Sequence, residues 1–98
     1  MDKTSRWHIL FSGTVQHVGF RYTALYFSKG LYLTGWVRNN PDGSVEMEAQ
    51  GDIRCLRKFV IKLKSEPHIH ITDVAITEIE PVVAERKFRV LEEEEYNF

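Results

Sequence analysis

The chain has 98 residues, with 13 Lys and Arg against 14 Asp and Glu, one cysteine and a formal net charge of -1. This length fits a single domain over residues 1–98, which buries roughly 65% of its surface on folding and needs no disulfide. The charge balance argues against a nucleic-acid-binding surface, the lone Cys55 suits a reducing cytoplasm, and no apolar run reaches the about 18 residues of a membrane helix.

The hydrophobic pattern predicts five strands and two helices. The third strand has the clearest signal, because Val45, Met47 and Ala49 alternate with polar residues. The Asn-Pro-Asp-Gly turn at residues 40–43 predicts a hairpin between this strand and the one before it. In chain order we expect a strand over residues 7–12, a helix over 20–29, strands over 33–39 and 45–50, a helix over 53–64, and strands over 69–76 and 88–91.

Some ends and irregularities of these elements can also be predicted. Asp52 is the expected N-cap of the second helix, and Gly30 is the expected C-cap of the first. The apolar residues of the fourth strand change parity between Ile71 and Val74, which predicts a bulge or a kink near Thr72 and Asp73. The run Glu92–Glu95 carries like charges and should be solvated.

The element order is strand, helix, strand, strand, helix, strand, followed by a short final strand. This order is typical of the ferredoxin-like α+β sandwich, βαββαβ. We therefore expect two helices on one face of an antiparallel sheet of four to five strands. The same fold supports many unrelated functions, so the function has to be inferred from a site.

The connection between the first strand and the first helix is suited to binding an anion. Residues 13–21 read Gly-Thr-Val-Gln-His-Val-Gly-Phe-Arg. Such a loop can present successive backbone N–H groups at the positive end of a helix. Arg21, in the first turn, can add a bidentate guanidinium. A phosphate-sized dianion suits this combination; the alternative is an ordinary connection with a surface arginine.

A second motif lies at the end of the second predicted strand. Residues 35–39 read Gly-Trp-Val-Arg-Asn and are followed by the hairpin turn. Asn39 does not titrate and offers one acceptor and two donors, so it can hold a water molecule beside an anion. The alternative role of Asn39 is to cap the turn.

Together, the motifs G-x-V-Q-x-V-x-F-R and G-W-V-R-N-x-x-D-G-x-V resemble the two signature motifs of the acylphosphatase family. They span residues 13–45, and the predicted element order and the chain length extend the resemblance to nearly the whole chain. Two motifs at this separation are far more specific than either alone. The resemblance implies hydrolysis of a small-molecule acyl phosphate to a carboxylate and inorganic phosphate, with no metal and no organic cofactor.

The resemblance also assigns roles to individual residues. It implies that Arg21 and the loop amides bind the phosphate group, and that Asn39 orients the attacking water. The predicted catalytic residues are therefore Arg21 and Asn39. The predicted phosphate-binding residues are Gln16, His17, Val18, Gly19, Phe20 and Arg21.

His17 departs from the family pattern, because it stands where the family usually has glycine. If the loop needs a positive φ there, histidine costs about 1–3 kcal/mol of strain, although it tolerates that region better than most residues. Three outcomes are open: an unaffected loop, a phosphate-binding module with weak or no catalysis, or an imidazolium that assists phosphate binding in mild acid. Tyr32 is a smaller departure, near the helix exit, where the family often has glycine.

Other features of the sequence indicate no further site. His68 and His70 would share one face of a strand, but no third or fourth metal ligand is evident, so we expect no metal. A nucleic-acid-binding or regulatory domain is disfavoured by the balanced charge and by the lack of a basic, aromatic strand motif. We expect a monomer, because no long apolar stretch is left over once the core is assigned.

Overall fold

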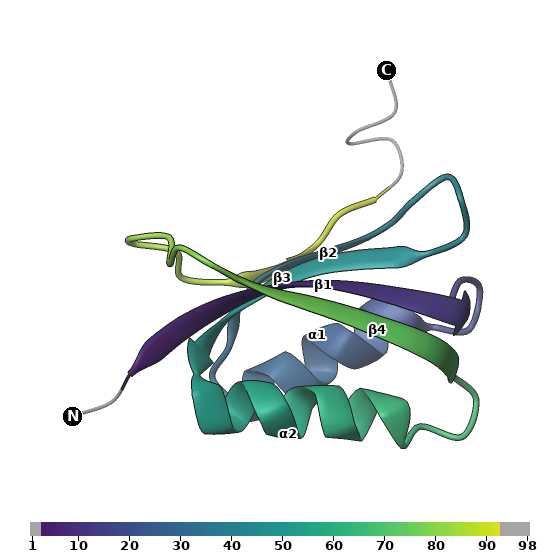
Figure 1. Cartoon of the computed structure of the whole chain (residues 1–98), viewed down its shortest axis with the longest axis horizontal. Coiled ribbons are helices and arrows are strands. Elements are labelled where there is room, and N and C mark those ends of the chain that lie inside the picture. Colours follow the sequence, from purple (N-terminus) through teal and green to yellow (C-terminus); the bar gives the residue numbers. More distant parts are fainter. Residues whose placement is uncertain (1–2, 93–98) are drawn as a thin grey trace.

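The chain folds into one β-sheet that is covered on a single face by two helices (Figure 1). The computed structural model describes residues 3–92. Its elements are β1 (Thr4–Thr14), α1 (Phe20–Gly30), β2 (Thr34–Asn39), β3 (Val45–Asp52), α2 (Ile53–Lys64), β4 (His70–Ile79) and β5 (Phe88–Val90). The ferredoxin-like α+β class is thus confirmed. Of the acidic run that was expected to be solvated, only Glu92 lies among the described residues.

The sheet has the strand order β4-β1-β3-β2-β5. Antiparallel pairing joins β1 to β3 and β4, and β2 to β3. The prediction of a purely antiparallel sheet is wrong at one edge, because β5 runs parallel to β2. The reason is that Ile79, the last residue of β4, lies in the same row of the sheet as Thr34, the first residue of β2. The chain crosses the sheet at that end and enters β5 in the direction of β2.

The predicted N-cap and bulge are confirmed. The Asp52 carboxylate accepts the backbone N–H of Arg54 at 2.8 Å. Hydrogen bonds from the Arg54 side chain and backbone lower the pKa of Asp52 to about 2. On β4, Thr72 is the extra residue of the bulge, because Ser12 pairs with Asp73 and Gly13 with Ile71.

The predicted end of the first helix is wrong. Gly30 is the last helical residue, and the C-cap is Leu31. The left-handed conformation that often ends a helix falls at Tyr32, which has φ 56. The strand β2 begins after this turn, at Thr34, which is one residue later than predicted.

The core lies between the sheet and the helices. Alternate residues of β1, β2 and β3 point into it and meet the apolar stripes of α1 and α2. Phe20, the first residue of α1, packs against Phe11 of β1 in a tilted arrangement, with ring centroids 4.9 Å apart and an interplanar angle of 57°. This contact fixes the start of α1 against the sheet. Among residues 3–92, no helix is both long enough and apolar enough to cross a membrane.

The other face of the sheet is polar and holds the crossing segment 80–87 in place. The buried Arg6 guanidinium binds Glu48 and Glu85, each at 2.8 Å. Gln50 exchanges two hydrogen bonds with the backbone of Val82, at 3.0 and 2.7 Å. Charge-assisted and paired bonds of this kind tie the long connection to the sheet.

Gly35 permits the close approach of β2 and β3. It has φ +140, and a Cβ atom there would lie 1.9 Å from the backbone oxygen of Glu48. Gly43 in the hairpin turn has φ +95, but a Cβ there would meet nothing within 4 Å. We expect Gly35→Ala to lower the free energy of unfolding by about 2–5 kcal/mol, from backbone strain and overpacking together. Urea denaturation measures the loss, and Gly43→Ala, which has the strain alone, should lose clearly less.

Candidate active site

The β1–α1 loop and the end of β2 meet at one end of the molecule, where Figure 1 shows the loop and the β2–β3 hairpin. A pocket of ≈ 250 Å³ lies between them. It is lined by Val15, His17, Gly19, Phe20, Arg21, Tyr22, Asn39 and Glu92. The two residues with predicted catalytic roles, Arg21 and Asn39, therefore lie in one pocket.

The N-terminus of α1 opens onto this pocket. Its N-cap is Gly19, which has φ 77 and no side chain to cap the helix. The first N–H groups of a helix lack intrahelical partners, and the helix dipole adds partial positive charge there. The arrangement suits an anion that accepts several backbone hydrogen bonds.

The Arg21 side chain is held at the wall of the pocket by the segment that follows β5. Its Nη1 donates to the backbone oxygen of Leu91 at 3.1 Å and lies 3.5 Å from a carboxylate oxygen of Glu92. Leu91 is itself tied to β2, because its N–H donates to the oxygen of Val37 at 2.9 Å. Within residues 3–92, the Arg21 guanidinium makes its hydrogen bonds through Nη1, so Nε and Nη2 can serve a ligand with the fork geometry of a guanidinium.

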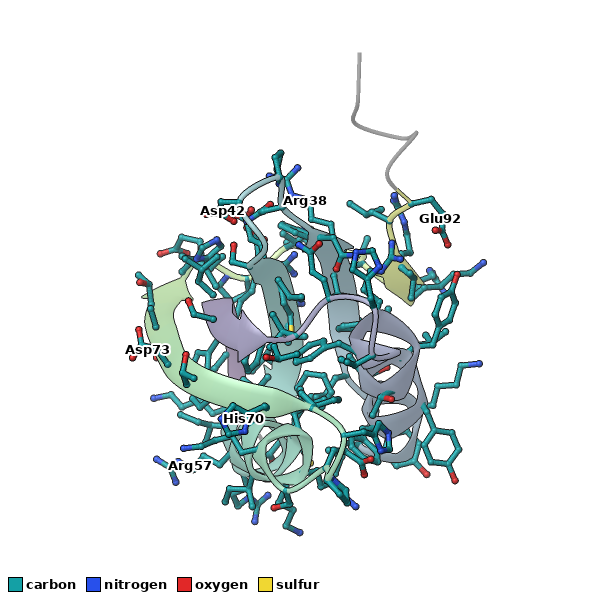
Figure 2. The ribbon with its side chains drawn as sticks, turned by 90° about the vertical axis from the view of Figure 1, so that its right-hand side faces the viewer. Arg38, Asp42, Arg57, His70, Asp73 and Glu92 are labelled. Atoms are coloured by element: carbon teal, nitrogen blue, oxygen red, sulfur yellow. The ribbon has the colours of Figure 1, made fainter. Side chains whose placement is uncertain are left out.

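Glu92 and Tyr22 are pocket residues that sequence reasoning missed. The Tyr22 hydroxyl donates to the Glu92 carboxylate, and Figure 2 shows Glu92 at the same end of the molecule as Arg38 and Asp42 of the hairpin. In the sequence, Glu92 begins a run of like charges that is expected to be solvated, and no local pattern indicates otherwise. The parallel direction of β5 brings it here. An anion in the pocket would therefore lie near this carboxylate as well as near Arg21.

Asn39 is the last residue of β2 and is 5% exposed. The turn behind it is closed by several hydrogen bonds. Asn40 N–H donates to the oxygen of Ser44 at 2.9 Å, and the Asp42 carboxylate accepts the hydroxyl and the N–H of Ser44 at 2.7 and 2.9 Å. These two bonds, the hydroxyl first, hold the pKa of Asp42 below its usual value. A rigid turn keeps Asn39 in one place at the pocket.

Two of the predicted phosphate-binding residues point elsewhere. The carboxamide nitrogen of Gln16 donates to the backbone oxygens of Asn40 and Ser44, at 2.7 and 2.8 Å. The Val18 side chain packs against the hydrophobic core. Neither lines the pocket, so any contact of these two residues with phosphate would be through their backbone amides, which stays a prediction.

His17 has φ 65 and an exposed side chain at the edge of the pocket. The loop thus does need a positive φ where the family usually has glycine. We expect His17→Gly to change kcat/KM for an acyl phosphate by less than about threefold, because the loop already has a conformation that glycine adopts readily. Steady-state kinetics from pH 5 to 8 measure this. A gain of tenfold or more would show that histidine distorts the loop, and a loss confined to acidic pH would show that the imidazolium assists binding.

The two histidines considered for a metal site do not lie together on a strand. His70 begins β4, whereas His68 lies in the preceding turn with Nε2 3.4 Å from Glu66 Oε1. Within residues 3–92, no group of three His, Cys, Asp or Glu side chains is placed to hold a metal ion.

The fold and the pocket define a small α+β domain with a pocket, suited to an anion, between a strand–helix loop and a strand end. A family model described as Acylphosphatase matches residues 7–90. The acylphosphatase of Chlorobaculum tepidum is 41% identical over 87 residues, covering 88% of this chain and 95% of that protein. That of Geobacillus kaustophilus is 40% identical over 89 residues, covering 88% and 93%. The crystal structure of acylphosphatase from Bacillus subtilis matches with a TM-score of 0.84 and 34% identity, over 90% of this chain and 99% of that one.

The chain therefore belongs to the acylphosphatase family, whose members are hydrolases that act on acyl phosphates. The resemblance drawn from two short motifs is confirmed across the domain.

Proposed function

We propose that the chain hydrolyses small acyl phosphates in the pocket between the β1–α1 loop and β2. The observation that carries this proposal is that a guanidinium, the N-terminus of a helix and a buried amide line one pocket: Arg21, Gly19 with Phe20, and Asn39. The names of the relatives point to the same reaction.

In the proposed mechanism, Arg21 and the loop amides bind the phosphate and Asn39 orients a water molecule. The water oxygen attacks phosphorus while the bond from phosphorus to the acyl oxygen breaks. The bond's electron pair leaves with the carboxylate, and the water proton passes to a phosphate oxygen. Because a carboxylate is a good leaving group, positioning and charge stabilisation should suffice, without a strong base.

The proposal includes no metal ion and no organic cofactor, because Arg21 and the helix N-terminus provide the positive charge that the phosphate needs. We also propose that the chain acts as a monomer in the cytoplasm. The single cysteine, which allows no internal disulfide, supports that compartment.

Hydrolysis of benzoyl phosphate, with and without a chelator, tests the proposed function. We expect turnover that the chelator does not change. Loss of turnover with the chelator would contradict the metal-free mechanism, and absence of turnover in both conditions would contradict the function itself.

The second candidate function is a phosphate-binding module with weak or no catalysis. The positive φ of His17 favours it, since a strained loop can hold phosphate in an unproductive position. Calorimetric binding of inorganic phosphate without hydrolysis of benzoyl phosphate would support this alternative.

A further inference from the structure

We propose that Gln16 is a positioning residue, which fixes Asn39 relative to the phosphate-binding loop. The proposal rests on the proposed function, because it concerns the alignment of the oriented water with the bound phosphate. It assigns to Gln16 a role different from contact with the phosphate, since its side chain does not line the pocket.

The sheet alone does not hold the two halves of the site together. Val45 of β3 pairs with Phe11 on one side and with Asn39 on the other, and this is the last row shared by β1 and β3. Beyond it, Ser12 to Thr14 pair with β4 alone, on the side away from β2. The last residues of β1, from which the loop continues, therefore share no row of paired strands with Asn39.

Gln16 bridges this gap across the start of β3. Its carboxamide has two N–H donors, and they bind the oxygens of Asn40 and Ser44 at 2.7 and 2.8 Å. The same two oxygens close the hairpin, since they accept the N–H groups of Gly43 and Asn40 at 3.1 and 2.9 Å. Gln16 thus holds the loop to the closing pair of the hairpin, one residue beyond Asn39.

The chemistry explains why this link should affect turnover more than phosphate binding. In the proposed mechanism, phosphate is held by Arg21, the loop amides and the helix N-terminus, whereas the Gln16 carboxamide binds the oxygens of Asn40 and Ser44. The water is held by Asn39, on the other side of the bridge. A displacement of about 1 Å between a nucleophile and its target can cost about 10²-fold in rate. Loss of the bridge should therefore lower kcat and leave phosphate affinity nearly unchanged.

The test compares Gln16→Ala with a matched control, Gln50→Ala. Gln50 also makes two hydrogen bonds to a backbone segment, that of Val82, but at the far end of the sheet. For each variant, kcat and KM for benzoyl phosphate, Ki for inorganic phosphate and the unfolding temperature are measured. We expect Gln16→Ala to lower kcat by about 10- to 100-fold with Ki within about threefold of the wild type. Gln50→Ala, which also removes a hydrogen bond from Arg6 Nη1 to Gln50 Oε1 at 3.0 Å, should lose at least as much stability and keep its kcat.

A second variant, Gln16→Glu, gives a readout that a purely structural role would not move. Its ionised carboxylate faces two carbonyl oxygens and repels them, whereas the protonated form can donate to one of them. Because the carbonyl oxygens favour the protonated form, the ratio of variant to wild-type kcat should rise as the pH falls toward 5.

The outcomes separate this inference from the proposed function. Wild-type turnover decides the function, and the Gln16 variants decide the inference. An unchanged kcat in both Gln16 variants overturns it. A raised Ki with kcat preserved also overturns it, because Gln16 would then be a phosphate ligand. An equal loss of kcat in Gln50→Ala would also overturn the inference, because the loss in Gln16→Ala would then be explained by a general loss of stability.

Discussion

Arg21→Ala is expected to lower kcat/KM for benzoyl phosphate by about 10³-fold or more. The substitution removes the charged, bidentate donor that is proposed to bind the phosphate together with the backbone amides of the loop, and a single such donor is commonly worth about 10²–10³ in rate. Most of the loss should come from phosphate binding, so the Ki for inorganic phosphate should rise together with KM. Steady-state kinetics with phosphate as a competitive inhibitor measure both.

Arg21→Lys and Arg57→Ala are the controls for this prediction. Lysine keeps the charge but not the fork, so its activity should fall between those of the wild type and Arg21→Ala. Arg57 is exposed on α2, outside the pocket, and its removal should leave the kinetics unchanged. Near-wild-type hydrolysis by Arg21→Ala would disprove the proposed mechanism.

Asn39→Ala is expected to lower kcat by about 10²–10³-fold and to change KM by less than about threefold. The reason is that Asn39 is assigned to the water and not to the phosphate, so its contribution is made in the transition state. Single-turnover measurements at saturating benzoyl phosphate give the chemical step directly. A large rise in KM with kcat preserved would assign Asn39 to substrate binding instead.

Asn39→Asp tests the same role with a side chain of similar shape. The carboxylate lacks the amide donors and brings a negative charge beside the phosphate, so both kcat and phosphate affinity should fall. Because Asn39 is 5% exposed, thermal unfolding of each variant has to accompany the kinetics. A variant that unfolds near the assay temperature would explain lost activity without any role in catalysis.

Much of the fold follows from local pattern. Three features depend only on neighbouring residues, and each is predicted correctly. They are strand β3 from the alternation over Val45 to Ala49, the Asp52 N-cap of α2, and the bulge in β4 from the change of parity. The direction of β5 depends instead on where the chain crosses the sheet after Ile79. No residue within the short strand Phe88–Val90 encodes that crossing, so its parallel pairing was missed.

Only part of the candidate site can be predicted from the sequence. Arg21 and Asn39 belong to separate motifs, and their meeting in one pocket depends on how the loop crosses β3. The resemblance raises the question of a positive φ at His17, because the family usually has glycine there. The positive φ of the exposed Tyr32 does not follow from the sequence, because Gly30 is the residue that the helix pattern favours as the end of α1. Gln16 binds Asn40 and Ser44, which are 24 and 28 residues away in the sequence. Glu92 contacts Tyr22 and Arg21, which are 70 and 71 residues away. Sequence spacing alone does not indicate contacts over such separations.

The position of β1 has a consequence for how the protein is made. Its two ladder partners are β3 and β4, which are synthesised long after it. Until residues 70–79 have emerged from the ribosome, one edge of β1 has no partner, and Ser12 to Thr14, which lead into the β1–α1 loop, lack their strand. A nascent chain that already contains both motifs would therefore hold an incomplete site, and the proposed activity would be acquired only after β4 has been synthesised.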